Sequence, residues 1–156
     1  MKRIAATMVL VVLLAGCGNR HRSDSSLMAE FNAKKPAFDR IRELITQDNR
    51  TLVLLVSATD IKAPGIPPSH VEEYRKILAD LKARSLAYHA GAQGTIVIEL
   101  SKVKHGRSVD ISTKGFVWLK RKPDSLSNGL NKIEANQPAM YRHIDEGWYL
   151  FTRRRD

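Results

Sequence analysis

The sequence predicts an α+β domain in which two main helices pack on one face of a mostly antiparallel sheet of about four strands. Two stretches carry apolar residues at helical spacing, and several others run apolar or alternate as strands do. The later strands follow one another through short turns, which favour antiparallel neighbours. A doubly wound α/β fold is the weaker alternative, because no second strand–helix–strand unit follows.

The first helix is expected from Leu27, since the apolar residues that follow recur at spacings of three, four and seven up to Ile45. Pro36 lies inside this run, so we expect a kink or a new helical segment there. The run "TLVLLV" at 51–56 predicts a strand buried on both faces. Two glycine and proline clusters then predict a loop over 57–68.

Ser69 and Glu72 have the spacing of a capping box, which predicts the start of a second helix. Its apolar stripe is expected to end near Tyr88 and Gly91. Residues 95–101, "TIVIELS", alternate cleanly between apolar and polar positions and predict a strand.

The last third of the chain is expected to be rich in strands. "KHGR" at 104–107 predicts a hairpin turn, after which one strand runs through "SVDIST" and, past Gly115, through "FVWLKRK". A looped or weakly helical insert is expected over 123–138. The final strand is "GWYLFTRR" at 147–154, preceded by a charged turn.

The N-terminus has the features of a secretory signal. Lys2 and Arg3 precede an apolar stretch at 4–15 that is shorter than the ~20 residues a helix needs to cross a bilayer. Small residues follow at its end, as at a signal-peptide cleavage site. Residues 1–16 are therefore expected to be a cleaved signal peptide.

The residues "LAGC" refine this expectation. Leu14, Ala15, Gly16 and Cys17 resemble the lipobox of bacterial lipoproteins, and Cys17 is the only cysteine in the chain. The resemblance implies that the Cys17 thiol carries a diacylglyceryl group and that the signal is cut before it. It also implies a frequent further acylation of the new amino group, attachment to the membrane through this lipid, and no other cofactor.

The resemblance also implies where the protein works. Gly18 follows the lipidated cysteine where an inner-membrane retention signal would have Asp. In a Gram-negative cell this favours the outer membrane, facing the periplasm. Two or three acyl chains hold a domain stably at a bilayer. This export route argues against a nucleic-acid partner, despite the formal net charge of +10.

The mature chain is expected to hold one domain at 27–156. Residues 17–26 are polar after the cysteine and lack periodicity, so they predict a flexible tether that reaches ~15–18 Å. Once Cys17 is modified, no thiol is left for a disulfide, a nucleophile or a thiolate metal site.

The sequence contains no catalytic or metal-binding motif. The five histidines make no i, i+4 pair, and no serine lies in a nucleophile elbow. His143, Asp145 and Glu146 could assemble an acid/base or metal site, but a charged turn before the last strand is the simpler interpretation. We therefore expect no enzyme, no catalytic residue and no metal.

Basic residues concentrate late in the chain. From residue 102 onward twelve basic residues meet six acidic ones. A meander of the late strands would place six of them at one end of the sheet, and residues 120–122 at the other. These candidate contacts for phosphates of lipid or lipopolysaccharide, or for an acidic protein surface, are Lys102, Lys104, Arg107, Arg153, Arg154 and Arg155. A solvated rim that aids solubility is the alternative.

Large rings are concentrated in the same region, where six of the ten aromatic residues follow residue 115. Most are expected to fill the core. If one face of the sheet is open, some rings must be exposed, with Trp118 and Trp148 as candidates, and exposed aromatic patches mark binding surfaces.

Together these features predict a membrane-anchored lipoprotein that is a non-enzymatic binding or structural protein of the cell envelope. An inhibitor or immunity lipoprotein, which neutralises a toxin or hydrolase, is the alternative. An envelope enzyme that uses His143 with Asp145 or Glu146 is the third hypothesis.

Overall fold

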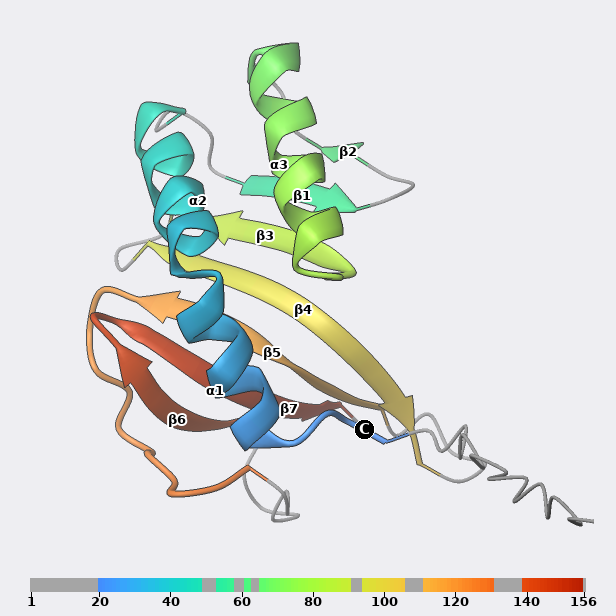
Figure 1. Ribbon diagram of the computed structural model, residues 1–156, viewed down its shortest axis with the longest axis vertical. Helices are drawn as coiled ribbons and strands as arrows, with labels where there is room; N and C mark the ends of the chain where they lie inside the picture. The colour runs from blue at the N-terminus through green and yellow to red at the C-terminus, as the bar shows by residue number, and fades with distance from the viewer. Residues whose placement is uncertain are drawn as a thin grey trace, which may run out of the picture.

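The fold is α+β, as the sequence predicts (Figure 1). The computed structural model describes residues 20–48, 53–57, 61–62, 65–90, 94–105, 111–130 and 139–155. Within them lie three helices and seven strands. In chain order they are α1 (Asp24–Ala33), α2 (Lys35–Gln47), β1 (Val53–Ser57), β2 (Ile61–Lys62), α3 (Pro68–Asp80), β3 (Ser85–His89), β4 (Thr95–Lys104), β5 (Ile111–Leu119), β6 (Ala139–Asp145) and β7 (Trp148–Arg155).

The strands form one sheet in the order β2-β1-β3-β4-β5-β7-β6. All neighbouring strands in it pair antiparallel. The antiparallel character matches the prediction, whereas the number of strands among the described residues exceeds the expected four. The long strands β4, β5 and β7 form its centre and carry the basic residues of interest.

All three helices lie on one face of the sheet (Figure 1). Their apolar stripes meet the inward side chains of the strands in one core, at whose centre Phe38 packs against Phe116 and Trp148 at ring-centroid distances of 4.8 and 5.1 Å. Phe31 of α1 completes this group at 4.5 Å from Phe38. No helix in the described part of the chain is long and apolar enough to cross a membrane.

The expected break at Pro36 is present. The helix α1 ends at Ala33, and the backbone N–H of Lys34 closes it by donating to the carbonyls of Glu30 and Phe31. Pro36 then lies in the first turn of α2, where its missing N–H costs no helical hydrogen bond. The proline therefore divides one expected helix into two.

The second expected helix is shorter than its apolar pattern suggests. The helix α3 ends at Asp80, and Lys82 follows in the left-handed region with a φ of 50°. Residues 85–89 form β3 between β1 and β4, so the predicted end near Tyr88 and Gly91 is wrong. Leu86 of this strand is buried in the core, so its apolar side chain belongs to the sheet and not to the apolar stripe of a helix.

The predicted capping box is also wrong. Pro67 is the N-cap of α3, no side chain caps this end, and Ser69 lies inside the first turn. The prolines at 67 and 68 explain the difference, because proline is favoured at the first helical position and sets the backbone there.

Two strands had no clear pattern in the sequence. The two-residue strand β2 pairs at the edge of β1, inside the expected loop. The strand β6 includes His143 and Asp145 of the expected charged turn. The turn itself is shorter than expected and consists of Glu146 and Gly147, with φ values of 27° and 83°. Positive φ at both positions is typical of the tight turns that connect twisted hairpins.

The pairing of β4 with β5 contains a local irregularity. The register shifts between Glu99 and Ser101, so one residue is inserted into β4. Gly115 lies opposite Glu99, and a Cβ atom at Gly115 would come within 2.0 Å of the carbonyl oxygen of Ile98. Only glycine allows the two backbones to approach this closely.

We expect Gly115→Ala to lower the free energy of unfolding by about 3 kcal/mol, because the added methyl group must displace the backbone of β4. Gly129→Ala is the matched control, since its Cβ would meet no atom closer than 4.0 Å. Denaturant unfolding of both variants measures the difference. Equal stability of the two variants would show that the close approach is not a constraint.

Candidate functional site

The basic residues of the late strands gather at one end of the sheet, as expected. The register places Lys102 of β4 opposite Thr113 of β5, which in turn lies opposite Arg153 of β7. Lys104 and Arg155 are both opposite Ile111 in the same way. Residues 120–122 follow β5 at the other end, and Arg107 lies outside the described residues.

These residues do not form one surface, because strand alternation divides them between the two faces. Arg153 lies on the face without helices, where Glu99 contacts both Arg153 and Lys102 at 3.4 and 3.3 Å. Arg154 points to the opposite face, where it lines a cavity. The basic end of the sheet therefore has two sides with different surroundings.

The two tryptophans differ from the expectation. Trp148 is only 2% exposed and packs against Phe38 in the main core, so its predicted exposure is wrong. Trp148 and its neighbour Tyr149 point to opposite faces of the sheet, and Trp148 points to the face that the helices cover. Trp118 is partly buried, with the guanidinium of Arg42 5.2 Å from the ring centroid.

Other aromatic residues occupy the face without helices. Tyr149 and Phe151 form a second, smaller apolar cluster there with Val117, and Tyr141 packs against it. A cavity of about 320 Å³ lies on this face, and Arg153 lies at its rim. Tyr149 and Phe151 are only 5% and 4% exposed and Tyr141 is partly buried, so the described residues of this face do not form the expected exposed aromatic surface.

The second cavity, on the helix side of the basic end, has a volume of about 340 Å³. Four basic side chains line it, two from the segment before α1 and two from the strands: Arg20, Arg22, Lys114 and Arg154. The hydroxyls of Ser112 and Thr152 belong to its wall. We call it the basic cavity.

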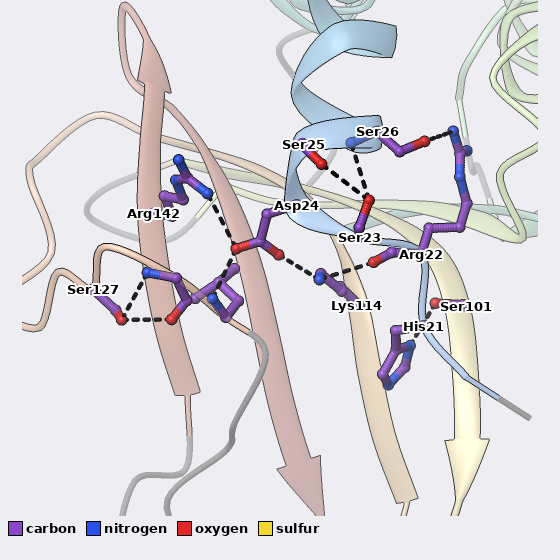
Figure 2. Close-up of polar contacts among 12 residues, drawn as sticks. His21, Arg22, Ser23, Asp24, Ser25, Ser26, Ser101, Lys114, Ser127 and Arg142 are labelled. Atoms are coloured by element: carbon purple, nitrogen blue, oxygen red, sulfur yellow. Dashed lines mark hydrogen bonds and ion pairs between the residues drawn. The ribbon is translucent and has the colours of Figure 1, made fainter.

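Lys114, which lines the basic cavity, forms a buried ion pair with Asp24 (Figure 2). Asp24 and Lys114 are 4% and 2% exposed, and Oδ1 of Asp24 lies 2.5 Å from Nζ of Lys114. Oδ2 of Asp24 accepts hydrogen bonds from the N–H of Leu130 at 2.8 Å and from Arg142 at 3.3 Å. Lys114 also donates to the carbonyl of Arg22 at 3.0 Å. The carboxylate and the ammonium are thus both paired and hydrogen-bonded.

The local structure suits a carboxylate at this position. Asp24 is the first residue of α1, after the N-cap Ser23, whose hydroxyl accepts from the N–H of Ser26 at 3.2 Å. The positive end of the helix dipole favours an anion there. Burial acts to raise the pKa of the Asp24 carboxyl, but the hydrogen bonds from Lys114, Leu130 and Arg142 bring that pKa below its ordinary value.

His21 binds the N-terminal segment to the basic end of the central strands β4 and β5 (Figure 2). Its Nδ1 lies 2.6 Å from the hydroxyl of Ser101, and its Nε2 lies 2.6 Å from the hydroxyl of Ser112. Ser112 also contacts Nε2 of His105 at 2.6 Å. Burial, then the charges of Lys114 and His105, lower the pKa of the His21 imidazole from 6.5 to about 4.

These contacts correct the expected tether. Residues 21–26 form the first turn of α1 and the segment docked on β4 and β5, so the prediction of a flexible tether over 17–26 is wrong for this part. The acidic first turn after Ser23 was a usable signal for an earlier helix start. The pairing of Asp24 with Lys114 left no local signal, because 90 positions separate them.

The contacts of His21 differ from those of a catalytic base. A hydroxyl beside an imidazole is the arrangement of a nucleophile and its base, but a pKa of about 4 makes His21 a weak base, and a serine rather than a carboxylate orients it. His143 and Asp145 do not join in a site, since His143 packs on Tyr149 and Asp145 pairs with Lys35 of α2. In the described part of the chain, no three potential metal ligands cluster.

Comparison with protein-family models, with curated proteins and with solved structures finds no match for this chain.

We expect Lys114→Met to lower the free energy of unfolding by about 3 kcal/mol, because it leaves the Asp24 carboxylate buried without its closest cation. The double variant Asp24→Asn/Lys114→Met removes both charges and should recover part of the loss. Chemical denaturation of the two variants tests this order. If the double variant is less stable than Lys114→Met, the charge of Asp24 is not the cause.

The pKa of His21 predicts a dependence of stability on pH. Above pH 6.5 the imidazole is neutral in both states, whereas between pH 6.5 and about 4 only the unfolded chain takes up the proton. The free energy of unfolding should therefore fall as the pH is lowered from 6.5 to about 4. The expected loss is of order 1 to 2 kcal/mol, because the ring is partly exposed and solvent screens the effect.

The variant His21→Gln keeps hydrogen-bonding groups but cannot titrate. We expect it to lose less stability than the native protein between pH 7.5 and pH 4.5, measured by denaturant unfolding at each pH. Parallel pH profiles of the two proteins would contradict the assignment to His21.

Proposed function

We propose that this chain is a lipid-anchored lipoprotein of the cell envelope, a non-enzymatic binding protein that holds the basic end of its sheet against an anionic bilayer surface. The lipobox-like residues Leu14–Ala15–Gly16–Cys17 supply the anchor. The observation that carries the proposal is the docking of the segment from His21 to Asp24 onto that same end of the sheet.

The length of chain between anchor and domain supports this orientation. Consecutive Cα atoms are about 3.8 Å apart, so the Cα of Cys17 lies within ~11 Å of the Cα of Arg20 in any conformation. Arg20 lines the basic cavity, and His21 is hydrogen-bonded to β4 and β5. A lipid on Cys17 would thus keep the basic end close to the headgroups, rather than hold the domain away from them.

The charge of this end suits such a surface. Lys102 and Lys104 are exposed on β4, and Arg20 and Arg22 are exposed in the docked segment. Each basic residue close to an anionic membrane contributes about 1 kcal/mol to binding at physiological ionic strength, and the contribution falls off within a Debye length. The acyl chains supply the affinity, and these charges determine which side of the domain faces the lipid.

The proposal includes a location and a partner class. In a Gram-negative cell, Gly18 after the cysteine favours the outer membrane, facing the periplasm. The partners are anionic lipid, lipopolysaccharide or an acidic envelope protein, and not nucleic acid. No metal or cofactor besides the lipid on Cys17 is part of this proposal.

An inhibitor or immunity lipoprotein is the second candidate, and the face without helices favours it. There Tyr141 of β6 and Phe151 of β7 line the cavity of about 320 Å³, where a protein partner has room to dock. A bilayer bound at the basic end of the sheet would leave this face accessible. Capture of a toxin or hydrolase that binds tightly to this face would establish the second candidate.

We expect the native protein to carry a lipid on Cys17 and to bind vesicles with the basic end of its sheet against the lipid. In vesicles of phosphatidylglycerol, Lys102 and Lys104 should react with an amine-directed reagent about threefold more slowly than in neutral detergent. Lys120 and Lys122, at the other end of the sheet, are the matched control and should react equally in both.

Mass spectrometry reads both the lipid and the labelling at each lysine. Half-molar salt should remove the protection, because it shortens the Debye length to about 4 Å. An unmodified Cys17 in the mature protein would overturn the anchor. Equal protection of all four lysines would overturn the orientation.

A further inference from the structure

We propose that the basic cavity binds the phosphate group of an anionic lipid headgroup. The cavity lies between the docked N-terminal segment and strands β4, β5 and β7, and its volume of about 340 Å³ is sufficient for a headgroup. The choice of a lipid as the source of the phosphate rests on the proposed function, whereas the phosphate site itself rests on the cavity.

An unsatisfied hydroxyl in the wall is the most direct indication of a ligand. Thr152 is 1% exposed, and its Oγ1 has no hydrogen-bond partner. A buried polar atom without a partner costs stability, so such atoms call for an explanation. The register places Thr152 of β7 opposite Lys114 of β5, and both side chains line the basic cavity. An oxyanion at this point would accept from both.

The mouth of the cavity adds donors from another direction. Arg20 and Arg22 line it from the docked segment, and Arg22 also pairs with Glu30 at 2.5 Å. Guanidinium groups bind phosphate through two parallel N–H bonds, and ammonium and hydroxyl groups complete the set. Donors that approach from several sides suit a tetrahedral phosphate better than a planar carboxylate.

The hydrogen-bonded group of Ser112, His21 and His105 can change its protonation when an anion binds. Ser112 has one proton to donate, yet its hydroxyl lies 2.6 Å from both His21 and His105, so at least one of these rings must donate to it. Burial is the largest cause of the low pKa of His21, and the charges of Lys114 and His105 add to it. These same charges attract an anion. A bound phosphate would therefore raise the pKa of His21, and this change reports binding directly.

The position relative to the anchor indicates the source of the phosphate. Arg20 lines the cavity and lies three residues after Cys17, the proposed lipidation site. A cavity held this close to the bilayer meets headgroup phosphates at high local concentration. Free phosphate has the same donors available to it but lacks this advantage.

The experiment titrates the native lipidated protein in neutral detergent with three probes: inorganic phosphate, dihexanoyl phosphatidic acid and dihexanoyl phosphatidylcholine. Calorimetry gives the affinity, and the imidazole resonances of His21 give its pKa with and without each probe. We expect phosphatidic acid to bind most tightly and to raise the pKa of His21. We expect inorganic phosphate to bind at least tenfold more weakly, and phosphatidylcholine not to bind.

Two variants test the assigned donors. Thr152→Val replaces the unsatisfied hydroxyl with a methyl group of equal size, so it should leave the melting temperature unchanged or higher while weakening phosphatidic acid binding about tenfold. Arg20→Gln removes an exposed charge at the mouth and should weaken binding to a similar extent. Arg121→Gln, at the other end of the sheet, is the matched control and should bind as the native protein does.

The outcomes separate the two proposals. Native affinity in Thr152→Val and Arg20→Gln, or no change in the pKa of His21, would overturn the phosphate site. Equal affinity for inorganic phosphate and phosphatidic acid would overturn the lipid headgroup as the ligand. The lipid on Cys17 and the lysine footprint are measured independently, so the failure of either proposal is distinguishable from that of the other.

Discussion

The ion pair between Asp24 and Lys114 is the contact on which the basic end of this domain depends. Removing two charges from water is costly, and these two persist because each also has hydrogen bonds, to the N–H of Leu130, to Arg142 and to the carbonyl of Arg22. The pair therefore joins the start of α1, the middle of β5, the loop before β6 and β6 itself. Lys114 also lines the basic cavity, so the same interaction contributes to the fold and to the site.

At the basic end of the sheet, the two faces of the central strands carry different kinds of side chain. The register aligns Lys102, Thr113 and Arg153 in a row across β4, β5 and β7, while alternation turns Arg154 to the other side. On one face the cations adjoin Glu99 and an apolar aromatic cluster. On the other they adjoin hydroxyls and imidazoles. The first face suits a protein partner, and the second suits a small anion.

The sequence predicted those parts of the fold that depend on local pattern. The α+β class, the break at Pro36 and the strands β1, β4, β5 and β7 follow from periodicity and from proline chemistry. The limit of α3 and the strand β3 did not, because apolar residues such as Leu86 fit a helical stripe and a strand equally well. The strand β6 was hidden for a related reason, since Arg142 and His143 lie within it and obscure its alternation.

For the candidate site, the sequence by itself determined how many basic residues there are and gave the single cysteine its lipobox-like context. It also predicted that the late basic residues lie at the same end of the sheet. Only the tertiary structure decided which residues form a cavity. Asp24 meets Lys114, and His21 meets Ser101 and Ser112, across 80 positions or more. Such polar contacts depend on long-range packing and leave no periodicity, so a segment that looks like a tether became the wall of the site.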